Sequence, residues 1–121
     1  MLNGRRVLLV EDDPLVVDTI RDMVQEAGGE LAASAATISE ARRLLRADAA
    51  FDVALLDVNL ADGEGTPLID GLKARRIPVV VYTGGALPAA LQQRHPGLRV
   101  LSKPVIRARL IAELRSASPR G

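Results

Sequence analysis

The short segment from Val53 to Asp57 limits the possible folds more than any other stretch, because an apolar run ends there abruptly in a carboxylate. Four apolar residues are too few for a helix, and they lack the polar alternation of a strand with one face in water. They predict a parallel strand that is buried on both faces. Ligands of open parallel sheets bind beyond the carboxyl ends of the strands, which is where Asp57 falls. The polar, glycine-rich residues 59–65 then predict a loop.

Four more short runs repeat this pattern along the chain and complete a predicted five-stranded sheet. The predicted strands span residues 7–10, 31–35, 53–56, 79–82 and 98–101. Amphipathic segments between them predict helices over residues 14–27, 86–94 and 105–117, and two more that begin after the caps Thr37 and Thr66. The last helix is expected to turn four apolar residues inward: Ile106, Leu110, Ile111 and Leu114. Such alternation of strands and helices favours a doubly wound α/β fold with a parallel sheet, in which the alanine-rich second strand lies near an edge.

The composition excludes several classes of protein. A chain of 121 residues, 48% of them hydrophobic, can fold as one domain with its own core, and we expect no output domain. It has no cysteine, which excludes disulfides, thiolate metal sites and cysteine nucleophiles. The net charge is +1 and the only aromatic residues are Phe51 and Tyr82, so direct nucleic-acid binding is not indicated. No apolar run suits a membrane span or a signal peptide, and we expect a cytoplasmic protein.

Polar side chains also follow three of the other predicted strands. Glu11 and Asp12 follow the first strand, Thr83 follows the fourth, and Lys103 follows the fifth. Each has an ordinary explanation when taken alone, such as an acid at a helix start or a lysine in water. The carboxyl ends of parallel strands share one edge of the sheet, so these residues and Asp57 together predict a single pocket.

The expected pocket combines three carboxylates with a lysine and a hydroxyl. Each pair of close carboxylates costs about 1 kcal/mol in water and ~4 kcal/mol at an effective dielectric constant of about 20. Magnesium relieves that cost, because it binds through one or two carboxylates and keeps water and phosphate oxygens as its other ligands. Lys103 offers a point charge and Thr83 a hydroxyl donor for phosphoryl oxygens, and Asp57 can attack a phosphoryl group. These residues predict magnesium-dependent phosphoryl transfer.

On these residues the chain resembles the receiver domains of two-component response regulators over essentially its whole length. The matching pieces are Leu9 to Asp13, Asp57 with Gly65 eight residues later, Thr83, and Lys103-Pro104. The resemblance implies a flavodoxin-like fold with strand order 2-1-3-4-5 and a phosphoacceptor role for Asp57. It also implies that Mg²⁺ is held by four groups: Glu11, Asp12, Asp57 and the backbone carbonyl of Asn59. Thr83 and Lys103 would hold the phosphoryl oxygens.

The same resemblance implies a phosphorylation-dependent switch, and not an enzyme that turns over a separate substrate. The phosphoryl group would come from a sensor histidine kinase or a histidine phosphotransfer protein. The domain would then bind an unknown protein target or drain phosphate from the kinase, and residues 86–94, 98–101 and 105–117 form the face through which a homodimer could assemble. Val100 departs from the family, which usually has an aromatic residue there. We therefore expect Gly84 and Gly85 to begin the movable segment.

Two other functions stay open at this point. A pseudo-receiver would bind partners without ever taking phosphate, and the complete acidic pocket argues against it. A haloacid-dehalogenase-type phosphatase also uses a strand-end aspartate with magnesium. That class needs a second aspartate where this chain has Asn59, and it normally needs a longer chain.

Two basic features outside the pocket have ordinary explanations. His95 could carry a phosphoryl group, but it is expected at the other end of the strands, and a solvated loop histidine is favoured. The last helix carries three arginines that could bind a partner, although a solvated face is favoured: Arg107, Arg109 and Arg115.

Overall fold

Five parallel strands alternate with five helices in the computed structural model, which describes residues 2–47, 50–58 and 66–117. The strands are β1 (Arg6–Val10), β2 (Glu30–Ala35), β3 (Val53–Asp57), β4 (Val79–Thr83) and β5 (Arg99–Ser102). The helices are α1 (Pro14–Glu26), α2 (Ile38–Ala47), α3 (Thr66–Ala74), α4 (Ala89–Arg94) and α5 (Arg107–Ala117). The strand order β2-β1-β3-β4-β5 confirms the flavodoxin-like topology and places β2 at an edge.

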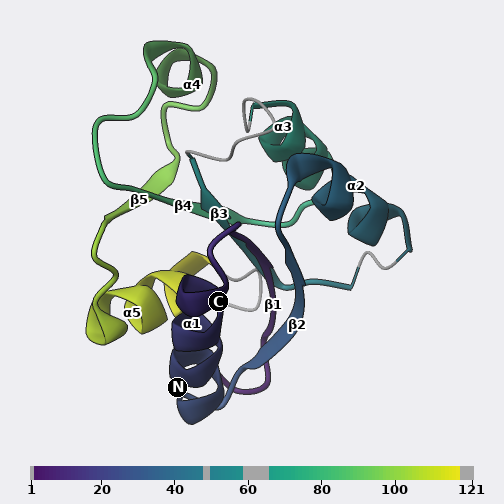
Figure 1. The fold of residues 1–121 in the computed structure, drawn as a ribbon. Helices are drawn as coiled ribbons and strands as arrows, with labels where there is room; N and C mark the ends of the chain where they lie inside the picture. The colour runs from purple at the N-terminus through teal and green to yellow at the C-terminus, as the bar shows by residue number, and fades with distance from the viewer. Residues whose placement is uncertain (1, 48–49, 59–65, 118–121) are drawn as a thin grey trace.

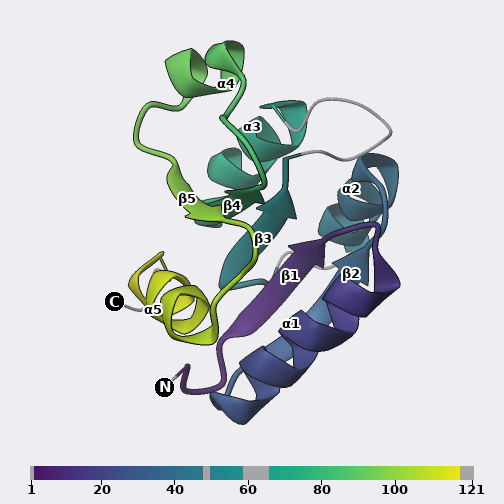
Figure 2. The same ribbon diagram turned by 60° about the vertical axis from the view of Figure 1, so that its left-hand side comes forward.

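The helices cover the sheet from both sides (Figures 1 and 2). Alternation along β1 shows how: Val7 and Leu9 join the core beneath α1 and α5, whereas Leu8 and Val10 join the core beneath α2, α3 and α4. Two apolar cores therefore lie on opposite faces of one sheet. Among the described residues, the helices are too short or too polar to cross a membrane.

The central strand β3 is buried along its whole length, as its apolar sequence predicts. It pairs with β1 on one side and with β4 on the other, so both of its backbone edges are hydrogen-bonded. Leu55 belongs to one apolar core and Leu56 to the other. This placement brings Asp57, the last residue of β3, to the middle of the carboxyl edge of the sheet.

Helices α1 and α2 begin at the local sequence signals that predict them. The Asp13 carboxylate caps α1 by accepting a hydrogen bond from the backbone N–H of Leu15 at 2.9 Å. The hydroxyl of Thr37 accepts from the backbone N–H of Glu40 at 3.0 Å. Glu40 reaches back to the backbone N–H of Ala36 at 2.9 Å, one residue before the position that a capping box usually uses. The prediction that Thr37 caps α2 is confirmed, but Ala36 and not Thr37 donates its N–H to Glu40.

Two helices begin later than their sequences predict. Helix α4 begins at Ala89 because Pro88 has an extended backbone, with φ −57° and ψ 139°. Helix α5 begins at Arg107, and the carbonyl of Ile106 accepts a hydrogen bond from the backbone N–H of Leu110 at 2.9 Å. Ile106 therefore precedes the helix, and the residue is 59% exposed. The prediction that Ile106 faces inward was wrong, whereas Leu110 is buried as expected.

Candidate functional site

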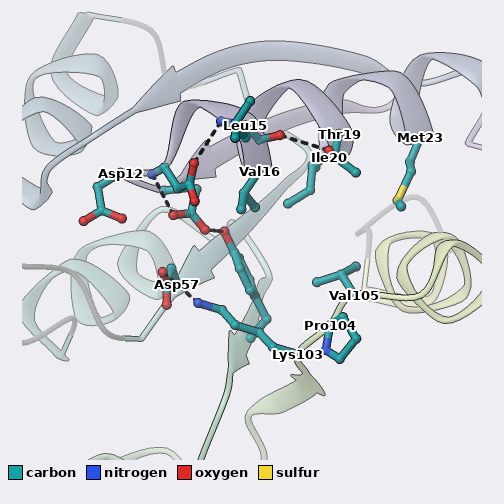
Figure 3. A pocket seen from close by; sticks show the side chains of 13 residues that line it. Asp12, Leu15, Val16, Thr19, Ile20, Met23, Asp57, Lys103, Pro104 and Val105 are labelled. Carbon is teal, nitrogen blue, oxygen red and sulfur yellow. Dashed lines mark hydrogen bonds and ion pairs between the residues drawn. The ribbon is translucent and has the colours of Figure 1, made fainter.

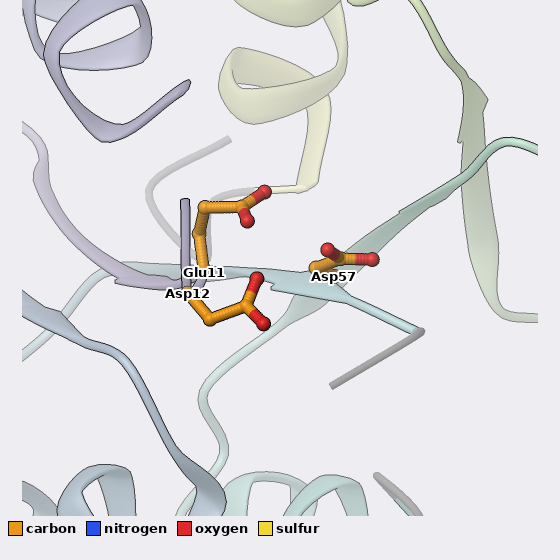
Figure 4. Close-up of side chains that lie close together, drawn as sticks. All are labelled: Glu11, Asp12 and Asp57. Carbon is orange, nitrogen blue, oxygen red and sulfur yellow. The ribbon is translucent and has the colours of Figure 1, made fainter. Parts of the chain in front are cut away.

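The ends of β1 and β3 bring three carboxylates together, as the sequence predicts (Figure 4). Glu11 and Asp12 follow β1, and Asp57 ends β3. One carboxylate oxygen from each residue lies within 4.8 Å of the others. Glu11 and Asp57 are buried, while Asp12 is exposed. Several oxygen donors at this spacing, two of them shielded from water, suit a hard divalent cation such as Mg²⁺.

Two hydrogen bonds hold the buried carboxylate of Glu11. One oxygen accepts from the backbone N–H of Asp13 at 2.9 Å, and the other accepts from the hydroxyl of Tyr82. Burial raises the pKa of Glu11, because desolvation disfavours its charged form, and the hydrogen bond from Tyr82 acts in the opposite direction. Burial and the Glu11 carboxylate both raise the pKa of Tyr82, so the phenol keeps its proton and acts as a donor.

Lys103, which directly follows β5, adds a positive charge to the three carboxylates. Its Nζ lies 3.1 Å from Oδ2 of Asp57, and the same ammonium lies 5.2 Å from the centre of the Tyr82 ring. The backbone N–H of Lys103 donates to the carbonyl of Thr83 at 2.9 Å, which joins the ends of β4 and β5. The lysine is thus held beside the predicted phosphoacceptor.

Thr83 is buried at the end of β4, and its hydroxyl accepts from the backbone N–H of Gly85 at 3.2 Å. That contact leaves the hydroxyl proton able to donate to another oxygen. The Asn59 carbonyl, predicted as a fourth metal ligand, lies outside the described residues. The structure therefore brings Glu11, Asp12, Asp57 and Lys103 together, with Thr83 on the neighbouring strand.

A cavity of about 430 Å³ opens beside these residues, between α1 and the segment that follows β5 (Figure 3). Asp12, Asp57 and Lys103 line its polar end. Its other lining residues are mainly apolar and come from both sides: Leu15, Val16, Ile20, Met23, Pro104 and Val105. A molecule that entered this cavity could reach the otherwise buried Asp57.

Sequence reasoning did not identify Tyr82 as part of the site. Its position on a buried strand predicts a packed side chain, and it is fully buried. The contact with Glu11 joins residues 71 positions apart and follows from the pairing of β1, β3 and β4. A usable signal was present, because a tyrosine in a run of valines must find a partner for its hydroxyl when it is buried.

The prediction that His95 is a solvated loop residue was wrong. Its side chain is buried at the end of α4, and Nε2 lies 2.9 Å from Oδ1 of Asp70 on α3. Arg94 also binds Asp70, with its Nη2 at 2.9 Å from Oδ2. The Asp70 carboxylate gives the buried imidazole a polar partner. Local sequence does not reveal this contact, because Asp70 lies on another helix. The three arginines of α5 are exposed, as expected: Arg107, Arg109 and Arg115.

Comparison with known proteins identifies the family of this chain. The family model for the response regulator receiver domain matches residues 7–115. Response regulator protein PilR of Pseudomonas aeruginosa is 34% identical over 116 residues, which are 90% of this chain and 25% of PilR. Sensor protein TorS of Escherichia coli is 32% identical over 111 residues, or 88% of this chain and 12% of TorS. The chain thus spans a quarter or less of the length of these two relatives.

A solved structure is similar over most of both chains. It is the receiver domain of sensor histidine kinase PA1611 from Pseudomonas aeruginosa PAO1, which has a magnesium ion coordinated in its active-site cleft. The TM-score is 0.77 and the identity 27%, with 94% of this chain and 97% of the other chain covered. From the family match over residues 7–115 and these similarities, the chain belongs to the receiver domains of two-component response regulators.

Proposed function

We propose that this domain is a phosphorylation-dependent signalling switch, in which Asp57 accepts a phosphoryl group. One observation carries the proposal: the Asp57 carboxylate lies between the Glu11–Asp12 pair and the Lys103 ammonium, at the polar end of an open cavity. A buried aspartate with a cation on one side and two more carboxylates on the other is costly unless the site binds a ligand that uses all of them.

The chemistry assigned to Asp57 is a transfer between two phosphoryl carriers. A carboxylate oxygen of Asp57 attacks the phosphorus atom, the bond from phosphorus to the donor atom breaks, and the donor leaves with that electron pair. The product is an acyl phosphate on Asp57, which water later hydrolyses. Lys103 then pairs with a phosphoryl oxygen, and the Thr83 hydroxyl donates a hydrogen bond to another.

Magnesium belongs to this proposal because of the chemistry of the donors. Glu11, Asp12 and Asp57 would hold the ion, and the carbonyl of Asn59 stays a predicted fourth ligand. When bound, the ion supplies positive charge that offsets both the carboxylates and the phosphoryl oxygens. Before it binds, Asp13 and Tyr82 keep the Glu11 carboxylate in place.

The partners follow from the family. A sensor histidine kinase or a histidine phosphotransfer protein would supply the phosphoryl group in the cytoplasm, and a protein target would read the phosphorylated form. A homodimer through α4, β5 and α5 is one form that this output could take. Two exposed apolar residues support that assignment: Val100 on β5, and Ile106 directly before α5.

Intact-mass measurement after incubation with acetyl phosphate and magnesium tests the proposal. The wild-type protein should gain one phosphoryl group, and Asp57→Asn should gain none. Asp18→Asn, an exposed aspartate on α1, is the matched control and should react like the wild type. A persistent adduct in Asp57→Asn would contradict the assignment.

Two results would favour the other functions instead. A wild-type protein that took no phosphoryl group but still bound a signalling protein would indicate a pseudo-receiver. Repeated turnover of a phosphate ester would indicate a phosphatase.

A further inference from the structure

Tyr82 lies between two members of the candidate site, Glu11 and Lys103. Its side chain is fully buried on β4, next to the strand that carries Asp57. It is also one of only two aromatic residues in the chain. Both ends of the side chain contact a site residue: the hydroxyl contacts Glu11, and the ring lies beneath Lys103.

The hydroxyl contact restricts the orientation of Glu11. The backbone N–H of Asp13 holds one carboxylate oxygen, and Tyr82 holds the other, so rotation of the carboxylate would break one or both bonds. The carboxylate keeps further lone pairs, because each oxygen can accept more than one hydrogen bond. Glu11 is therefore fixed in a position where it can also face a cation shared with Asp12 and Asp57.

The ring contact restricts Lys103. The ammonium lies 5.2 Å from the ring centre, within the range of a cation–π interaction, while it also reaches Oδ2 of Asp57 at 3.1 Å. A lysine has four flexible side-chain bonds and would otherwise lose much rotational freedom to reach one position. The contact with the ring limits this rotational freedom before a phosphoryl group arrives.

Packing alone does not account for this residue. A phenylalanine would fill the same space in the core beneath α1 and α5 and would place no polar atom in the interior. The hydroxyl instead reaches a carboxylate of the acidic group, where loss of a supporting hydrogen bond weakens metal binding.

We propose that Tyr82 is a positioning residue with two separable effects. Its hydroxyl orients Glu11 and thereby raises the affinity for magnesium, and its ring orients Lys103 and thereby raises the rate of phosphoryl transfer to Asp57. This inference rests on the proposed function, since the second effect requires that Asp57 accept a phosphoryl group.

Two substitutions separate the effects. Tyr82→Phe removes the hydroxyl and keeps the ring, whereas Tyr82→Leu removes both. Calorimetric titration with MgCl₂ should show about tenfold weaker binding in both variants. At saturating magnesium, the rate of phosphorylation by acetyl phosphate should be about fivefold lower in Tyr82→Leu than in Tyr82→Phe. If Tyr82→Leu does not fold, Tyr82→Met takes its place, because the unbranched methionine side chain is longer and adapts to the space that the ring leaves.

Two controls exclude a general structural effect. Val80→Ala removes volume from the same core on the same strand, and it should leave the magnesium affinity at the wild-type value. In a Glu11→Ala background, Tyr82→Phe should cause no further loss of magnesium affinity, because the group through which it acts is gone.

The outcomes distinguish this inference from the proposed function. Wild-type magnesium affinity in Tyr82→Phe would overturn the role of the hydroxyl. Equal rates for the phenylalanine and leucine variants at saturating magnesium would overturn the role of the ring. A wild-type protein that bound no magnesium or took no phosphoryl group would overturn the proposed function itself, and with it the corresponding role of Tyr82.

Discussion

Glu11 is a buried carboxyl group that lies next to the carboxyl groups of Asp12 and Asp57. Burial is the main reason that its pKa lies above the ordinary value of 4.5, and the nearby Asp57 adds repulsion. The Asp13 amide and the Tyr82 hydroxyl offset part of this cost. The remaining repulsion makes the acidic group costly to the fold when no cation is bound.

Magnesium should therefore stabilise the wild-type protein more than a variant that lacks one carboxylate. A ligand at 100 times its dissociation constant adds about 2.7 kcal/mol to the free energy of unfolding. Asp12→Ala should melt above the wild type without magnesium, because a repelling carboxylate is gone, and should gain less on addition of MgCl₂. Thermal melting of both proteins, with and without the ion, is the measurement. Equal gains in the two proteins would mean that the ion binds at another site.

Among the helices, α4 is held to the molecule by few contacts. It has six residues, one of them the buried Leu91, and Pro88 at its start makes no side-chain capping bond. At its other end, Arg94 and His95 bind Asp70 of α3, a group that we name the Asp70 clamp. The clamp therefore secures the carboxyl end of α4, while residues 84–88 lead into the helix without regular structure.

The Asp70 clamp predicts a dependence of stability on pH. The hydrogen bond from Arg94 is the main reason that the pKa of Asp70 lies below its ordinary value of 3.8. A carboxyl group whose pKa is lowered by folding stabilises the fold above its unfolded pKa, and that contribution is lost as the pH falls through the folded value. The wild type should thus be more stable than Asp70→Asn between pH 5 and 7, and the difference should shrink below about pH 4.

Urea denaturation at pH 7, 5, 4 and 3 measures that difference. Asp22→Asn, an exposed aspartate on α1, controls for the loss of a surface carboxylate. A difference between the wild type and Asp70→Asn that stayed constant down to pH 3 would show that the clamp does not act through the charge of Asp70.

At the scale of the whole molecule, burial is concentrated in the centre of the sheet. All five residues of β3 and of β4 are buried, and the two apolar cores cover both faces of these strands. The segment from Gly84 to Pro88 has no regular structure and follows directly after Thr83. Local opening should therefore occur in this segment long before the central strands open.

Amide hydrogen exchange should map this difference. In the free protein we expect high protection in β1, β3 and β4 and low protection from Gly84 to Leu91, with a rise in that segment when beryllofluoride and magnesium are added. The rise is expected because Thr83 would then bind a phosphoryl-like oxygen, which orders the residues after it.

Replacing Gly84 and Gly85 by alanine should blunt this response while Asp57 still takes phosphate. An added Cβ at Gly84 would lie 3.9 Å from Cδ of Lys103, and one at Gly85 would meet nothing within 4 Å, so both substitutions fit the fold. Full protection of residues 84–91 in the free protein, with a response confined to the neighbourhood of Val100, would show that this segment is not the switch.

Sequence alone predicted the elements and the polar residues that gather at the carboxyl edge of the sheet, because the signals that specify them act over short distances. The apolar run that ends in Asp57, the proline that begins α1 and the Thr37 cap each involve a few neighbouring residues. The family resemblance supplied the strand order, and the sheet confirms it. The placement of Glu11, Asp12 and Lys103 beside Asp57 followed from that order, since parallel strands end at one edge.

Only the tertiary structure decided which side chains meet across the fold. The bond between Tyr82 and Glu11 joins residues 71 positions apart, and the burial of His95 depends on Asp70, which is 25 positions away on another helix. The exposure of Ile106 depends on where α5 begins. Periodicity and capping describe interactions within about one or two helical turns, whereas these contacts arise only when separate elements pack together. For that reason the sequence predicted the acidic site, and the pairing of β3 with both β1 and β4 decided which side chains support it.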